Sequence, residues 1–519
     1  MKLVLSLMVA VAMGRVALGG DDGADEKKTP PAPPGDRETS ERIDRLEKEL
    51  QSLKAEQATR NAGLPPALGV PQQALPAARP GDSDLTASFT DGFHIKSGDG
   101  NFDLHVGGRV EEDFRGIFDR PVDGPTGPAA KVQPDTFFFH ELFLSVDGTI
   151  YKDWGFKLNG DFSPQGANAT NPLVGTGAIS AAIPEQAWVE WKHFDEFRLQ
   201  FGQFKSPNEA ESIESPLFQE VVNRSPMSRF VENWELGMQA YGSIWESLFT
   251  YQVALMNGRG HLANGGKGLV DDNDGKEVDA RMTAAPWVGD KQSFLKGLRV
   301  GVWGSYAHEG EGSPRTGQQP QGFPPGVGFQ STDLSVSYLE FGGAGGFVFH
   351  GVRLREGAEL TYAVGPFEFR GEVMQRRDEF FMTAGPFNGA DRMLGMHGYY
   401  GQVSYILTGE EKIPDARITP AHPLDLSKGD WGAMELAFRY GGVSFAQATL
   451  DEMFAPSTPA LSGSTNRITS LATGFNWWFT RNTKLAVDYI AEHYFDSVTL
   501  GAESRKHLNG ILAQVQIDF

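Results

Sequence analysis

Short runs in which apolar and polar residues alternate fill the chain from about residue 93 to its last residue. The final run, ILAQVQIDF (511–519), has apolar side chains at every second position, with Gln514, Gln516 and Asp518 between them. The same period of two occurs in FDLHVGGRV (102–110), PFEFRGEV (366–373), GAMELAFRY (432–440) and KLAVDYIAEHYF (484–495). Successive side chains of an extended strand point to opposite faces. Each run therefore predicts a β-strand with one apolar and one polar face.

Alternation of this kind is typical of a soluble β-sandwich as well as of a membrane β-barrel. The chain offers more than a dozen candidate strands, whereas a sandwich rarely needs more than about nine. Long polar stretches such as 257–277 and 308–333 alternate with tight connections such as 480–483. Short turns at one end and long loops at the other describe an outer-membrane barrel. We therefore predict an all-β transmembrane antiparallel β-barrel with an even number of strands, closed by pairing of its last strand with its first.

Aromatic residues near the predicted strand ends are expected at the membrane–water interface. The candidates are Tyr399, Tyr400, Trp477 and Trp478.

The first 92 residues have a different pattern. Residues 1–20 combine a basic start, a short apolar core and small residues, which predicts a signal peptide. Residues 21–38 are charged and rich in proline and are expected to form a disordered spacer. Residues 61–92 are rich in proline and alanine and predict a linker, so that the barrel domain would occupy 93–519.

Between the spacer and the linker, residues 39–60 carry a narrow apolar stripe. Ile43, Leu46, Leu50 and Leu53 recur at alternating spacings of three and four, and charged residues surround them. This pattern predicts a short coiled-coil helix, which would form by self-association because so short a helix is marginal alone. An amphipathic helix that lies on the protein's own body is the alternative.

Composition narrows the class of protein. No later stretch supplies the ~20 consecutive apolar residues of a spanning helix, and mean hydropathy is −0.33. The absence of cysteine means that stability must come from hydrogen bonding and burial. A formal net charge of −21 disfavours nucleic acid as a partner, and an acidic pore would favour cations.

Seven stretches, in order along the chain, resemble the phosphate-selective porin O/P family. They are ELFLSVDGTIYKDWGFKLNGDF (141–162), EFRLQFGQFKSP (196–207), FTYQVALMNGRG (249–260), EVDARMTAAPW (277–287), HGYYGQVSYILTGE (397–410), WGAMELAFRYGGV (431–443) and TGFNWWFTRNTKLAVDYI (473–490). The resemblance implies a trimeric outer-membrane barrel of about 16 strands, a loop folded into the lumen and passive passage of small anions. The helix at 39–60 would then lie in the periplasm and join three chains. Phe519 resembles the terminal signal that the outer-membrane assembly machinery recognises.

The predicted lumen carries both signs of charge. Where the family often has paired arginines, this chain has His140 and Glu141. Candidate pore-lining residues are Arg109, Arg115, Glu141, Lys157, Asp161, Glu190, Arg198, Arg281, Arg299, Arg353, Arg355, Glu368, Arg370, Glu372, Glu435 and Arg439. Mixed charge at similar density predicts a water-filled lumen in which most of these side chains pair with a neighbour on the next strand.

Residues 205–235 are the candidate constriction loop, because they are too long for a turn between strands. The charged residues of this segment are Lys205, Glu209, Glu211, Glu214, Glu220, Arg224, Arg229, Glu232 and Glu235. Six of them are acidic and three are basic. We expect the narrowest point to be net acidic and the channel to show weak or cation-leaning selectivity, with phosphate among the candidate solutes.

Chemistry beyond diffusion has little support in the sequence. HELF (140–143) begins like a zinc-protease helix but lacks the second histidine and lies in a predicted strand. We therefore predict no catalytic residue, metal ligand or cofactor. Two further hypotheses stay open. The chain could be a structural anchor whose helix tethers the outer membrane to another envelope layer, or a barrel hydrolase.

Overall fold

The computed structural model of the chain describes residues 85–118, 132, 135–163, 183–231, 234–258, 274–309, 329–339, 347–382, 387–453, 463–500 and 503–519. The predicted signal peptide, spacer and coiled-coil helix lie outside these residues. Two units are distinguished along the chain, Met1–Ala77 and Ala78–Phe519, and the description below concerns the second.

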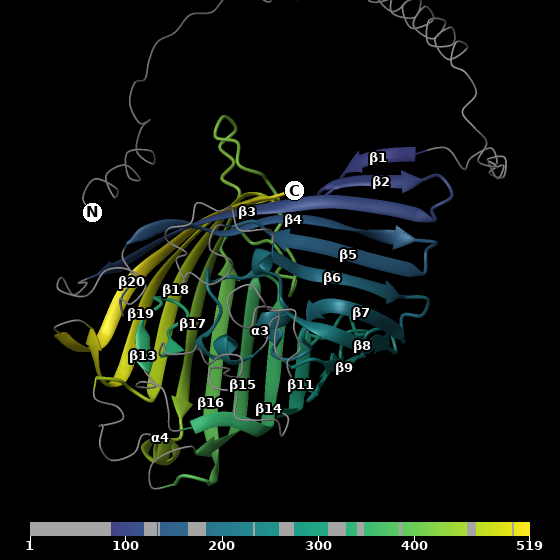
Figure 1. Cartoon of the computed structure of the whole chain (residues 1–519). Helices are drawn as coiled ribbons and strands as arrows, with labels where there is room; N and C mark the ends of the chain where they lie inside the picture. Colours follow the sequence, from purple (N-terminus) through teal and green to yellow (C-terminus); the bar gives the residue numbers. More distant parts are fainter. Residues whose placement is uncertain are drawn as a thin grey trace, which may run out of the picture. The chain divides into compact units, whose positions relative to one another are not determined.

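Antiparallel strands make up most of the second unit (Figure 1). Their bounds are β1 (Leu85–Phe89), β2 (Phe93–Ser97), β3 (Phe102–Phe118), β4 (Thr136–Ile150), β5 (Trp154–Asp161), β6 (Ile183–Trp191), β7 (Arg198–Lys205), β8 (Trp234–Ile244), β9 (Phe249–Met256), β10 (Glu277–Ala284), β11 (Leu298–Glu309), β12 (Phe329–Gln330), β13 (Ser337–Leu339), β14 (Phe347–Val364), β15 (Phe367–Met382), β16 (Asp391–Ile406), β17 (Ala433–Phe445), β18 (Arg467–Thr480), β19 (Thr483–Leu500) and β20 (Glu503–Asp518). Helical segments are α3 (Ala210–Ile213), η1 (Pro216–Phe218), η2 (Pro226–Phe230) and α4 (Gln447–Met453).

Sixteen of the described strands, β3 to β11 and β14 to β20, form a closed antiparallel barrel. Each pairs with the next in chain order, and β20 pairs with β3 from Asn509↔Phe118 to Asp518↔Arg109. The predicted closure and the expected number of about 16 strands are confirmed. The hairpin of β1 and β2 adds to the first residues of β3. β1 begins at Leu85, within the stretch 61–92 that the sequence assigns to the linker.

Residues on the two faces of the strands alternate as the sequence predicts. In β20, Val515 and Ile517 are exposed while Gln514 and Gln516 are buried. The exposed apolar side chains face away from the barrel axis, where lipid would cover them, and the polar ones face inward. The prediction that four aromatic residues lie at the membrane–water interface is wrong in part. Tyr400 and Trp478 are buried, because adjacent residues of a strand cannot both face outward.

The connections differ between the two ends of the barrel. At the end that holds both the start of β3 and the end of β20, most connections are short, such as 365–366 and 481–482. Residues 407–432 and, less so, 285–297 are the long exceptions at that end. Among the described residues, no helix has the length and apolar character that crossing a bilayer would require.

An apolar cluster fills part of the space inside the barrel. It combines inward-facing residues of β15 to β20, such as Phe380, Phe445 and Leu508, with Phe230 of η2 and Leu334 of the segment between β12 and β13. Tyr338 of β13 also belongs to it. The lumen is therefore not lined by polar side chains alone, because two inward-folded segments need an apolar surface on which to pack.

Candidate functional site

Residues 206–231, called the constriction loop below, leave the end of β7 and return to the start of β8. Lys205 and Trp234 face each other in the ladder between these strands, so a tight turn could have joined them. Pro216 and Pro226 instead begin the two short helices η1 and η2, because proline fits the first helical position. The loop contacts side chains of β15 to β19 on the inner wall, as described next, and this places it inside the barrel.

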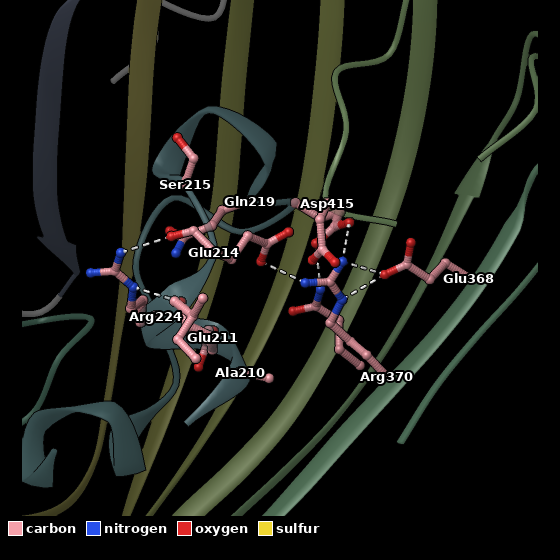
Figure 2. Close-up of polar contacts among 12 residues, drawn as sticks. Ala210, Glu211, Glu214, Ser215, Gln219, Arg224, Glu368, Arg370 and Asp415 are labelled. Atoms are coloured by element: carbon pink, nitrogen blue, oxygen red, sulfur yellow. Dashed lines mark hydrogen bonds and ion pairs between the residues drawn. The ribbon is translucent and has the colours of Figure 1, made fainter. Parts of the chain in front are cut away.

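Arg370 of β15 binds the constriction loop through two carboxylates (Figure 2). Its Nη1 donates to Glu214 Oε2 at 2.5 Å, and its Nη2 lies 3.4 Å from Glu220 Oε1. Its Nε also donates to Glu368 Oε1, on the same strand, at 2.5 Å. The guanidinium is buried. A buried charge of this kind is tolerated only when it is paired, so Arg370 and the loop depend on each other.

Lys412 holds the same part of the loop from residues 407–432. Its Nζ lies 2.6 Å from Glu220 Oε1 and 2.6 Å from Glu435 Oε1. Burial alone would raise the pKa of Glu220, but the adjacent Arg370 and Lys412 lower that pKa to about 2. The pKa of Lys412 is raised because its carboxylate neighbours outweigh its burial. Glu220 therefore carries a full negative charge that two cations of the wall neutralise.

A second set of contacts holds the loop against β17, β18 and β19. Arg439 of β17 lies 3.2 Å from Glu211 Oε1 and 3.1 Å from Asp333 Oδ1, on the segment between β12 and β13. The backbone N–H of Val222 donates to Asp488 Oδ2 at 2.6 Å. Asn476 Nδ2 donates to the carbonyl oxygen of Glu220 at 2.8 Å. One face of the loop is thus docked on the wall from β15 to β19.

Two cations, Arg224 of the loop and Lys205 at the end of β7, contact the loop away from Arg370. Figure 2 shows Arg224 and Arg370 on opposite sides of Glu214. Arg224 Nε donates to the carbonyl oxygen of Glu211 at 3.0 Å, and Lys205 Nζ donates to the carbonyl oxygen of Glu214 at 2.6 Å. Both cations bind backbone carbonyls of the loop rather than carboxylates in these contacts. The side of the loop that faces away from β15 to β19 therefore carries positive charge as well as acidic residues.

Two acidic residues of the loop carry less charge than their number suggests. Burial, together with the neighbouring Glu211, raises the pKa of Glu209 to about 8. Ser212 and Ser228 both donate to its carboxylate at 2.5 Å. Burial also raises the pKa of Glu214 to about 8 in spite of Arg370, because Glu220 holds the negative charge next to it. Both carboxyls are therefore harder to ionise than the carboxyl of an exposed glutamate.

The structure places most of the other predicted residues in local pairs. Arg109 pairs with Glu141, Arg281 with Glu359, and Arg353 and Arg355 with Glu277. Further contacts are Arg115 with Ser335, Lys157 with Asp147, Asp161 with Ser163, Glu190 with Lys192, Arg198 with Asp195, Arg299 with Asp415, and Glu372 with Trp303. Glu235 is buried and Arg229 is half-buried. Glu232 lies outside the described residues.

The sequence analysis missed several residues that hold the loop. Lys412 and Asp333 lie in connections, and Gln402, whose Nε2 donates to Glu220 Oε2 at 2.7 Å, lies in β16. Nothing in their local sequence distinguishes them from residues of exposed turns and ordinary strands. The one available signal was the length of residues 407–432, the longest connection at an end where most connections are short.

Comparison with known proteins adds the following. The sequence model of the family described as phosphate-selective porin O and P matches residues 106–519. Porin O of Pseudomonas aeruginosa is 25% identical over 448 residues, which cover 82% of this chain and 91% of that protein. Among solved structures, the outer membrane channel DcaP of Acinetobacter baumannii is 10% identical with a TM-score of 0.45, covering 82% of this chain and 99% of that one. OmpT of Vibrio cholerae is 9% identical with a TM-score of 0.44, covering 81% and 98%.

Proposed function

The chain belongs to the phosphate-selective porin O and P family, and from that premise we propose that it carries small hydrophilic solutes and ions through the outer membrane by passive diffusion and with weak selectivity. Membership of the family and the closed barrel make it an outer-membrane channel and not an enzyme. The solutes, the selectivity and the assembly described next are proposals.

One observation carries the proposal. The constriction loop lies inside the barrel and is fixed there by Arg370, Lys412 and Arg439, each of which pairs with a carboxylate of the loop. A segment docked across a lumen narrows it without closing the barrel. Passage is then limited by size and by the charges that remain unpaired at this level.

The charges at the constriction favour weak selectivity. The expectation of a cation-leaning channel came from six acidic residues against three basic ones in residues 205–235. Arg370, Lys412 and Arg439 now stand against these carboxylates, and burial raises the pKa of Glu209 and of Glu214, which makes both harder to ionise. The remaining preference for cations is therefore expected to be small.

Phosphate is proposed as one permeating solute among others. Arginine recognises phosphate through its planar fork of donors. The forks of Arg370 and Arg439 already donate to carboxylates, so phosphate would have to displace these before binding to either arginine. We therefore propose that phosphate passes without strong retention.

Reversal potentials of single channels in a tenfold KCl gradient test the selectivity. A perfectly selective channel gives about 59 mV of either sign. We expect a value below about 20 mV at neutral pH, with millimolar phosphate leaving the chloride current unchanged. A value near the full potential, or block of the current by phosphate, would contradict the proposal.

Assembly as a homotrimer is proposed through the a/d stripe of residues 39–60, in the periplasm, and insertion by the outer-membrane assembly machinery through Phe519. A chain that lacks residues 39–60 provides the test for the stripe. Its cross-linked trimers should decrease relative to the full chain, while folded barrels persist. If the shortened chain gives as many cross-linked trimers as the full chain, residues 39–60 are not needed for trimer assembly. Replacing Phe519 with alanine should lower the yield of inserted barrel.

A further inference from the structure

A β-bulge brings three metal-ligating side chains together on the inner wall. The register between β3 and β4 shifts between Glu111 and Glu112, which face Glu141 and Phe139. His140 is therefore the extra residue of the bulge. In a regular strand His140 and Glu141 would point to opposite faces, but a bulge can re-aim one of them. Both side chains consequently approach Glu111.

The three side chains are close enough to share one ion. A ligand atom from each of Glu111, His140 and Glu141 lies within 4.8 Å of the other two, the one such grouping of three found in the part of the chain that the structure describes. Ligands bound at about 2.1 Å to one tetrahedral metal ion are about 3.4 Å apart, so ligand-atom movements of at most about 1.4 Å would complete the site. Glu111 and Glu141 are buried, and the His140 side chain retains 26% exposure, which leaves it reachable by an ion.

His140 has the support that a metal-binding histidine requires. Its Nδ1 lies 2.7 Å from Asp113 Oδ2, and Asp113 Oδ1 accepts a hydrogen bond from Gln514 Nε2 at 2.9 Å. When Nδ1 donates to a fixed carboxylate, the lone pair of the neutral ring lies on Nε2. The same arrangement of carboxylate and imidazole stands behind most histidine ligands of metals and increases their basicity.

Arg109 is the cation that now faces these carboxylates. Its Nε lies 3.2 Å from Glu111 Oε1, and its Nη2 contacts Glu141 Oε2. Glu111 Oε2 has no hydrogen bond or ion pair within the described ranges, although the residue is only 1% exposed. A buried carboxylate oxygen without a donor is costly. The contacts of Arg109 thus leave this buried oxygen of Glu111 without a partner, and the unsatisfied oxygen points to a second cation.

We propose that Glu111, His140 and Glu141 bind a divalent transition-metal ion of the Zn²⁺ class on the lumen wall. One imidazole and two carboxylates suit Zn²⁺, Mn²⁺ or Fe²⁺ better than Mg²⁺. Three protein ligands leave at least one position for water from the lumen. The zinc-protease spacing that the sequence lacks is not needed, because the bulge supplies the proximity that a helix would otherwise provide. The ion and Arg109 compete for the carboxylates.

Equilibrium dialysis of the purified full chain against ZnCl₂, with the bound metal quantified, tests the site. We expect one Zn²⁺ per chain, not displaced by excess Mg²⁺. His140→Ala should weaken binding about tenfold or more, and Asp113→Asn should weaken it by less. His105→Ala is the matched control, because His105, on the neighbouring strand β3, likewise has its Nδ1 3.1 Å from a carboxylate, that of Asp147. If Zn²⁺ binding by the full chain does not saturate, or if the two histidine variants lose Zn²⁺ affinity equally, the proposal is overturned.

Arg109→Gln separates the metal site from a purely structural ion-pair cluster. Removing the competing guanidinium should tighten Zn²⁺ binding about tenfold or more, whereas unchanged or weaker binding would overturn the assignment to these carboxylates. Migration of unheated samples on SDS gels confirms that each variant is a folded barrel. Saturating Zn²⁺ should also shift the reversal potential towards anions in the full chain and not in His140→Ala. An equal shift in both would count against the site.

Discussion

Arg370 offers the sharpest perturbation of the channel, because its removal leaves carboxylates of the constriction loop without their cation. In Arg370→Gln the ion pairs with Glu214 at 2.5 Å and with Glu220 at 3.4 Å are lost. Breaking a buried pair by removing one partner costs about 3–5 kcal/mol. Lys412 still neutralises Glu220 in part, so we expect the lower end of this range, about 3 kcal/mol.

A cost of about 3 kcal/mol corresponds to a change of about 150-fold in the equilibrium between docked and undocked loop. The barrel itself remains paired on both sides of β15. Single-channel recordings in planar bilayers should therefore show a larger mean conductance and more open-channel noise. Arg377→Gln is the control on the same strand, because Arg377 pairs with Glu356 at 2.8 Å and both side chains are exposed. An exposed pair contributes about 0–1 kcal/mol.

A double variant checks that the effect is electrostatic. Glu220→Gln combined with Arg370→Gln removes both charges and leaves Lys412 paired with Glu435. Its open-channel noise should be lower than that of Arg370→Gln alone. If Arg370→Gln has the same conductance and open-channel noise as the unaltered chain, the reasoning that this arginine holds the loop is refuted.

Three further outcomes follow from the same contacts. The pKa of Glu220 is lowered from 4.5 to about 2, so its contribution to loop docking is present above about pH 4.5 and is lost as the pH falls towards 2. Channel noise should therefore increase as the pH falls through this window, and this increase should be absent in Glu220→Gln. Lys412→Met leaves Glu220 and Glu435 facing each other without their shared cation. Proteases added from the periplasmic side should therefore cut residues 407–432 of this variant faster than those of the control Lys428→Met, because Lys428 is exposed. Leu334 is fully buried, so Leu334→Ala should weaken packing of the inward segment by about 2–5 kcal/mol and raise conductance, while Leu426→Ala at an exposed position should leave conductance unchanged.

The barrel wall could be predicted from the sequence because each strand carries its own signal. Glu368, Arg370 and Glu372 are buried, and Phe369 and Val373 on the other face of the strand are exposed, as the period of two predicts. Alternation is a local property, and closure follows from the need to leave no strand edge in lipid. The position of β1 was missed, because LTASF, although it alternates apolar and polar residues, is only five residues long and follows a proline-rich stretch.

The docking of the inward segments could be predicted only in part. The length of residues 205–235 identified the constriction loop, and its charged residues were found by composition. Their partners could not be found, because Glu220 meets Lys412 and Arg370 across distances in sequence that no period or spacing encodes. The apolar end of the lumen was missed for the same reason. Phe380 and Met382 continue the inward face of β15, and only the segment packed on them explains why they are not polar.

The most direct test of the account compares the unaltered chain with one in which residues 207–232 are replaced by a short Gly/Asn turn. Lys205 and Trp234 are already paired in the ladder, so the turn can join β7 to β8 without disturbing the barrel. If the constriction loop limits passage, single-channel conductance in planar bilayers rises severalfold and larger sugars enter proteoliposomes. If the chain without the loop forms folded barrels that have the same conductance and the same size limit for sugars as the unaltered chain, the account is contradicted.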